Sequence, residues 1–187
     1  MDQLGRRRFM QGAALGALAF TVGGAQILLT PREARAQGVA LRTLRPLEAE
    51  TLAELGETLV PGAREAGIVH FVDQQLSVPP EEALLEARVL NVRPPFVNFY
   101  RTALAAVDRG SQAQNAGKRF TDLDAGAQHA FVDQMRQNKI DGWQGPPGSF
   151  VYLVTRSDAV DVVYGTVDGY AKLAIPYMAH IAPTARR

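Results

Sequence analysis

Cysteine is absent from all 187 residues of this chain. Its absence excludes disulfides, thiolate zinc sites, iron–sulfur clusters, haem attachment through C-x-x-C-H and a cysteine nucleophile. The sequence also has no G-x-S-x-G, no H-E-x-x-H and no phosphate-binding glycine loop. These absences leave few sequence signs of a catalytic or cofactor site carried by the chain itself.

An excess of charge of one sign is also lacking. Residues 1–36 contain five of the 20 basic residues and two of the 19 acidic ones, which leaves 15 basic and 17 acidic residues in 37–187. A nucleic-acid-binding domain needs a clustered basic face. The charge pattern therefore predicts no nucleic-acid partner.

The basic residues that stand out are at the N-terminus. Arg6, Arg7 and Arg8 precede Phe9 and Met10, and an uncharged stretch follows. A basic segment followed by a weakly apolar one is typical of an export signal. The pair Arg6 and Arg7, followed one residue later by Phe9 and Met10, has the twin-arginine form. That route exports proteins that are already folded.

A small-x-small triplet ends this segment. Ala34 and Ala36 flank Arg35 and form an A-x-A cleavage site. We therefore predict a twin-arginine signal peptide over 1–36 and one domain over 37–187, located in the periplasm. An uncharged run of about 20 residues can also span a bilayer. A retained membrane anchor is thus the alternative, although the glycines and polar residues in this run favour a cleavable signal.

The rest of the chain predicts an all-α fold. Apolar residues recur at three- and four-residue steps, bounded by Pro and Gly, and predict helices over 46–60, 68–76, 79–89, 94–110, 124–137 and 149–167. No alternating run predicts a sheet. The domain is expected to be a compact multi-helix unit with an irregular C-terminal segment rich in Gly, Pro and Tyr.

Two histidines could belong to a site. His70 with Asp73 and His129 with Asp133 have spacings that place each pair on one helix face. A di-metal helical bundle would use Glu-x-x-His, which does not occur here. Hydrogen-bonded or solvated histidines are therefore favoured, and we predict no catalytic, cofactor-binding or metal residue. The alternative is a free-standing periplasmic binding or metal-dependent protein that uses His70 and His129.

Aromatic residues are concentrated near the C-terminus. Trp143 is the only tryptophan, and four of the five tyrosines lie between positions 152 and 177. Such residues can close a helical core or form a partner surface, because Tyr and Trp are enriched at interfaces. Trp143, Tyr164, Tyr170 and Tyr177 are the candidate partner interface.

Two further stretches carry a family resemblance. Residues 59–73 read LVPGAREAGIVHFVD, in which PGAREAG is the most specific block, and FVYLVT begins the aromatic end of the chain at position 150. Together with the twin-arginine signal, they make the chain resemble the gluconate 2-dehydrogenase subunit 3 family. Its members are small subunits of periplasmic, membrane-associated sugar and alcohol dehydrogenase complexes.

The resemblance implies a division of labour. A large subunit of the glucose-methanol-choline type holds FAD and oxidises a sugar, polyol or alcohol, and a multihaem cytochrome c subunit passes the electrons to the membrane. The small subunit has no cofactor and is not catalytic. It escorts the flavin subunit through the twin-arginine translocon, stays bound and stabilises it.

Overall fold

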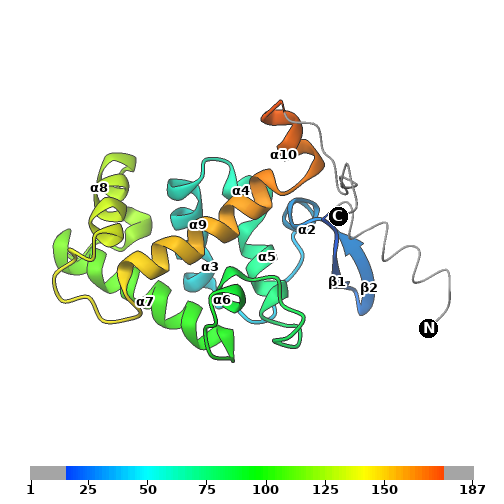
Figure 1. The fold of residues 1–187 in the computed structure, drawn as a ribbon, viewed down its shortest axis with the longest axis horizontal. Helices are drawn as coiled ribbons and strands as arrows, with labels where there is room; N and C mark the ends of the chain where they lie inside the picture. The colour runs from blue at the N-terminus through cyan, green and yellow to red at the C-terminus, as the bar shows by residue number, and fades with distance from the viewer. Residues whose placement is uncertain (1–15, 175–187) are drawn as a thin grey trace, which may run out of the picture.

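A computed structural model describes residues 16–174 of the chain (Figure 1). This part is mostly helical, as expected for an all-α fold. Four predicted signal residues, Arg6, Arg7, Phe9 and Met10, lie outside the described residues, as does Tyr177. No helix within 16–174 combines the length and the apolar character needed to cross a bilayer.

The elements follow in chain order. They are β1 (Leu18–Val22), β2 (Ala25–Leu29), α2 (Pro31–Ala36), α3 (Pro46–Leu59), α4 (Ala63–Ala66), α5 (Ile68–Gln75), α6 (Glu86–Val89), α7 (Phe96–Gln114), the 3-10 turn η1 (Phe120–Asp122), α8 (Ala125–Arg136), α9 (Gly148–Tyr164) and α10 (Val167–Lys172).

Helix α9 is the central element of the domain. It contacts α3, α4, α5, α6, α8 and α10, and in Figure 1 it runs across the domain with α8 near its first turn and α10 at its end. Its buried residues recur at three- and four-residue steps: Gly148, Val151, Val154, Thr155, Asp158, Ala159, Val162 and Val163. This broad stripe explains how one helix meets neighbours on several sides.

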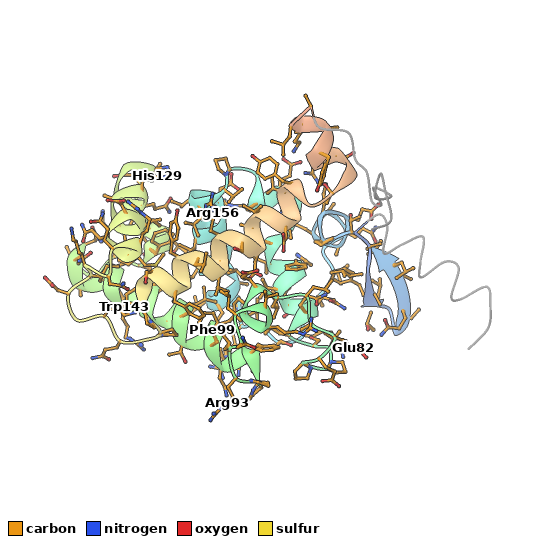
Figure 2. The ribbon with its side chains drawn as sticks, viewed as in Figure 1. Glu82, Arg93, Phe99, His129, Trp143 and Arg156 are labelled. Carbon is orange, nitrogen blue, oxygen red and sulfur yellow. The ribbon has the colours of Figure 1, made fainter. Side chains whose placement is uncertain are left out.

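Helix α7 supplies aromatic side chains to the same core. Phe99 packs edge-on against Tyr100 and against Phe150 of α9, with ring centroids 5.4 and 5.6 Å apart (Figure 2). Aromatic rings prefer such edge-to-face packing. The contacts connect α7 to the first turn of α9.

Two predicted helix boundaries were wrong. Residues 79–85 are not helical, and only Glu86–Val89 forms α6, because buried side chains bond the backbone here instead. The Leu84 N–H donates to Oε1 of Gln75 at 2.6 Å. Helix α7 also continues beyond Gly110 to Gln114. A Cβ on Gly110 would approach Ile140 and Phe131 at 3.0 and 3.4 Å. The glycine allows close packing there and does not end the helix.

The prediction that the chain contains no sheet was also wrong. Strands β1 and β2 pair antiparallel, with Val22 opposite Ala25. The two turn residues, Gly23 and Gly24, have φ of 57° and 84°. Positive φ at both positions is what the two-residue hairpin turn requires, and glycine adopts it without strain. Phe20 of this hairpin packs with Ala34 and Val39 in a small apolar cluster of its own.

Candidate functional site

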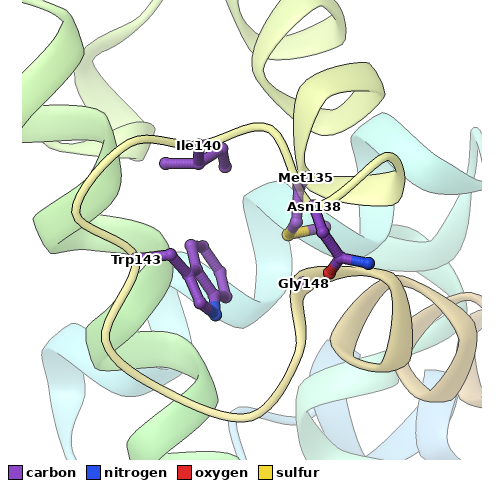
Figure 3. A pocket seen from close by; sticks show the side chains of 5 residues that line it. All are labelled: Met135, Asn138, Ile140, Trp143 and Gly148. Atoms are coloured by element: carbon purple, nitrogen blue, oxygen red, sulfur yellow. The ribbon is translucent and has the colours of Figure 1, made fainter.

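Trp143 lies in the loop between α8 and α9 (Figure 2). Its indole is half-buried against the core, and Nε1–H donates to the Pro146 carbonyl at 2.6 Å. The ring lines a cavity of about 40 Å³ together with Met135, Asn138, Ile140 and Gly148 (Figure 3). That volume holds a few water molecules at most and is far below that of a small-molecule site. The loop therefore fixes the indole and leaves part of it exposed.

Tyr164 and Tyr170 lie at the other end of α9. Tyr164 is the last residue of α9 and packs half-buried against the core, and Tyr170 is half-buried on α10. A Cβ on Gly169 would lie 2.5 Å from the Val163 carbonyl oxygen. The glycine thus lets α10 fold closely against the end of α9, which brings the two tyrosines to the same end of that helix.

The candidate aromatic residues do not form one patch. Trp143 is beside Gly148 at the start of α9, and Tyr164 closes the same helix 16 residues later. At about 1.5 Å per residue, the two ends are about 24 Å apart. All three described members are half-buried, and Trp143 and Tyr164 pack against the core.

His70 belongs to the core's edge and faces the N-terminal segment. Its Nε2–H donates to the Val39 carbonyl at 3.0 Å, and its Nδ1 is buried without a hydrogen-bond partner. Burial lowers the pKa of His70 below 6.5, because the charged ring would be poorly solvated. The imidazole is thus a neutral structural group.

His129 is exposed on α8 (Figure 2), away from α5. Its predicted neighbour Asp133 instead accepts hydrogen bonds from Arg136 and Gln137, each at 2.6 Å. Within residues 16–174, no three His, Asp or Glu side chains are grouped so that they could hold a metal ion. The structure does not bring His70 and His129 together.

Asp158, which the sequence interpretation passed over, is fully buried in α9. Its Oδ2 accepts the Tyr100 hydroxyl at 2.5 Å, and its Oδ1 accepts the Glu86 N–H at 3.0 Å. Burial raises the pKa of Asp158 from 3.8 to about 7, outweighing both hydrogen bonds. Burial and the neighbouring Asp158 likewise raise the pKa of Tyr100 well above 10. Asp158 therefore joins α6, α7 and α9. In the sequence, this buried group could have been found as an acidic residue within the apolar stripe of α9.

Arg119 makes a similar connection between η1, α3 and α7. Its Nε and Nη2 donate to Oδ2 of Asp108 at 3.1 and 3.0 Å, and its Nη1 donates to Glu50 at 3.1 Å. Thr51 also donates to Oδ2 of Asp108 at 3.0 Å. Arg119 thus pairs with two carboxylates from two helices, which stabilises the packing of these helices.

The PGAREAG block forms the one-turn helix α4 between α3 and α5. Gly62 and Gly67 flank it with φ of 92° and 88°, and Ala63 is fully buried. Both Gly62 and Arg64 donate their N–H to the Glu57 carboxylate at 2.9 Å. Two left-handed glycines and a small buried residue are what such a tight helix needs.

Comparison with known families gives a decisive match. Residues 46–176, from the first residue of α3 past α10, match the family model of gluconate 2-dehydrogenase subunit 3. The chain belongs to this family. The resemblance inferred from PGAREAG is therefore confirmed. Neither the curated proteins nor the solved structures gave a match.

Membership defines the chain's role at a coarse level. A member of the gluconate 2-dehydrogenase subunit 3 family is a small subunit of a dehydrogenase complex, associated with the other subunits. The match begins at Pro46, so β1, β2 and α2 lie outside the part shared with the family.

Proposed function

We propose that this chain is the non-catalytic small subunit of a membrane-associated, FAD-dependent dehydrogenase of the glucose-methanol-choline type. It escorts the flavin subunit through twin-arginine export and stabilises it afterwards. The observation that carries this proposal is the family match over 46–176. The substrate is a sugar, polyol or alcohol, and it binds to the flavin subunit.

The N-terminal sequence supports the escort role. Arg6 and Arg7, followed by Phe9 and Met10, have the form that directs folded proteins to the twin-arginine translocon. A chain with no cofactor of its own gains nothing evident from that route. A flavin subunit must fold around FAD before export and therefore needs that route. It can travel into the periplasm bound to this chain.

The polar groups that connect helices support a structural role. Asp158 is engaged by Tyr100 and the Glu86 backbone, and Arg119 is engaged by Asp108. Perturbed groups at active sites usually line a cleft. Here Asp158 connects helices inside the core, and Arg119 connects helices at a partly exposed position. The chemistry is accordingly assigned to the partners, with FAD in the large subunit and haem c in a multihaem cytochrome subunit that associates the complex with the membrane.

Isolation of the complex tests the proposal. A tagged copy of the full chain is purified from the periplasmic and membrane fractions, and bound proteins are identified by mass spectrometry. We expect a flavin subunit in equimolar amount, a flavin absorbance spectrum and dehydrogenase activity. The chain purified alone should show no flavin or haem absorbance. A stoichiometric cofactor in the isolated chain, or its isolation without any flavoprotein, contradicts the proposal.

A further inference from the structure

The predicted cleavage site is part of a folded helix: Ala34 is buried, whereas Ala36 is exposed. Ala34 has no exposed surface and packs with Phe20 and Val39, and Ala36 ends the same helix, α2. A signal peptidase must place both small residues of an A-x-A site in its own small pockets. The Ala34 methyl group is not available for that contact while α2 is in place.

The backbone around the site is fully engaged as well. The Ala34 N–H donates to the Thr30 carbonyl, and the Val39 N–H donates to the Ala34 carbonyl, both at 2.9 Å. Thr30 and Glu33 form a capping box, with the Thr30 N–H donating to Glu33 at 2.7 Å. Proteases act on chain that is opened locally, and such a helix must unwind first.

Helix α2 is seated on the shared family domain by close contact. A Cβ on Gly67 would lie 2.2 Å from the Pro31 carbonyl oxygen, so only glycine lets α2 approach the junction of α4 and α5. His70 adds a hydrogen bond to the Val39 carbonyl. Arg32 and Glu65 pair at 2.6 Å, but both are well exposed and such pairs contribute little.

We propose that residues 16–39, called here the docked segment, remain part of the folded protein and protect the Ala34–Ala36 site. Cleavage after Ala36 requires the docked segment to leave α4 and α5. This inference uses the proposed export signal only to identify the protease. It does not depend on any flavin partner.

The test measures cleavage of the purified full chain by a purified signal peptidase, followed by intact mass. A synthetic peptide of residues 28–44 serves as the undocked substrate. We expect the peptide to be cut after Ala36 and the folded chain to be cut at least about tenfold more slowly, because only its opened fraction is a substrate. Equal rates, or an uncut peptide, would overturn the proposal.

Two glycine variants show whether docking is the cause. Gly67→Ala places a methyl group against the Pro31 carbonyl and should raise the cleavage rate toward that of the peptide. Gly62→Ala is the matched control, because its φ of 92° causes the same backbone strain while nothing lies within 4 Å of its Cβ. It should be cut as slowly as the wild type. Equal rates for the two variants contradict the proposal.

A second pair of variants tests the proposal if Gly67→Ala loses its helical circular dichroism signal and so fails to fold. Phe20→Ala removes the centre of the small apolar cluster and leaves the main core intact, so it should accelerate cleavage. Leu28→Ala, on the same hairpin but 40% exposed, should not. No acceleration in Phe20→Ala overturns the proposal. Since no partner is present, failure of this test and failure of the co-purification are separate results.

Discussion

Asp158 lies in an environment very different from that of a free carboxyl side chain. It lies in a stripe of valines on α9, and its carboxylate has only the Tyr100 hydroxyl and the Glu86 N–H as donors. A buried carboxylate with two donors is still poorly solvated, so the proton is held more tightly in the folded state. Folding is therefore linked to pH through this group.

The sign of that linkage gives a prediction. With a folded pKa of about 7 against an ordinary 3.8, Asp158 binds more protons when folded. Its contribution to stability is fully present below about pH 4 and is lost as pH rises to about 7. Relative to Asp158→Asn, the wild type should lose up to about 4 kcal/mol of unfolding free energy over that range, at about 1.4 kcal/mol per pKa unit. Urea unfolding of both proteins between pH 4 and 8 measures it. A constant difference would contradict the raised pKa.

The sequence predicts some of the notable residues and not others. The prominent aromatic residues were found, but their burial and the separation of Trp143 from Tyr164 depend on how α9 packs. Asp158 was recoverable from its place between Val154 and Val162, one helical turn away on either side. The pairing of Arg119 with Asp108 joins residues brought together by tertiary packing, so no local pattern indicates it.

The helices themselves are the elements best predicted from sequence. The ranges expected for α3, α5, α8 and α9 were close to those observed, because each carries a regular apolar stripe and a recognisable start. Asp124, for example, caps α8 by accepting the Ala127 N–H at 2.9 Å. The β1–β2 hairpin was missed although Gly23 and Gly24, between two short apolar runs, are a known hairpin signal. The same residues also fit the weakly apolar segment of an export signal, which is not expected to form a hairpin.

The contacts between elements also give a prediction. Asp108 accepts hydrogen bonds from Arg119 and Thr51 and is about 20% exposed. Asp108→Ala therefore removes the carboxylate that accepts from Nε and Nη2 of the partly buried Arg119, and leaves the exposed pair with Glu50 as its one ion pair within residues 16–174. We expect a loss of about 2–3 kcal/mol of unfolding free energy, measured by urea unfolding.

Asp133→Ala is the control for that experiment. Asp133 also pairs with an arginine, Arg136, but both side chains are more than half exposed. Its loss should therefore cost less than about 1 kcal/mol. Similar effects of the two substitutions would show that the Arg119 cluster does not hold α3, α7 and η1 together.

At the scale of the whole molecule, aromatic residues that we predict to bind the partner also help to close the core. Trp143 and Tyr164 contact the core and still expose part of their rings. We predict that at least one of Trp143, Tyr164, Tyr170 and Tyr177 is an anchor against the flavin subunit. Truncating an anchor to Ala typically costs about 2 kcal/mol or more of binding free energy.

The readout separates binding from folding. An anchor changed to Ala should weaken the complex, measured by co-purification, while the subunit keeps its melting temperature. A core residue should lower the melting temperature instead. If all four substitutions destabilise the subunit and none selectively weakens assembly, the interface lies elsewhere. Leu84, just before α6, and Val89, its last residue, are 56% and 65% exposed and would then be the next positions to test.

The escort role is the central claim, and the location of the flavin subunit tests it most directly. Arg6, Arg7 and Arg8 are all replaced by Lys, since Arg7 and Arg8 could serve as a shifted pair, and the flavin subunit is quantified in cytoplasmic and periplasmic fractions. The account predicts that both this chain and the flavin subunit stay in the cytoplasm and that periplasmic dehydrogenase activity is lost. Normal periplasmic activity with all three arginines replaced would contradict it.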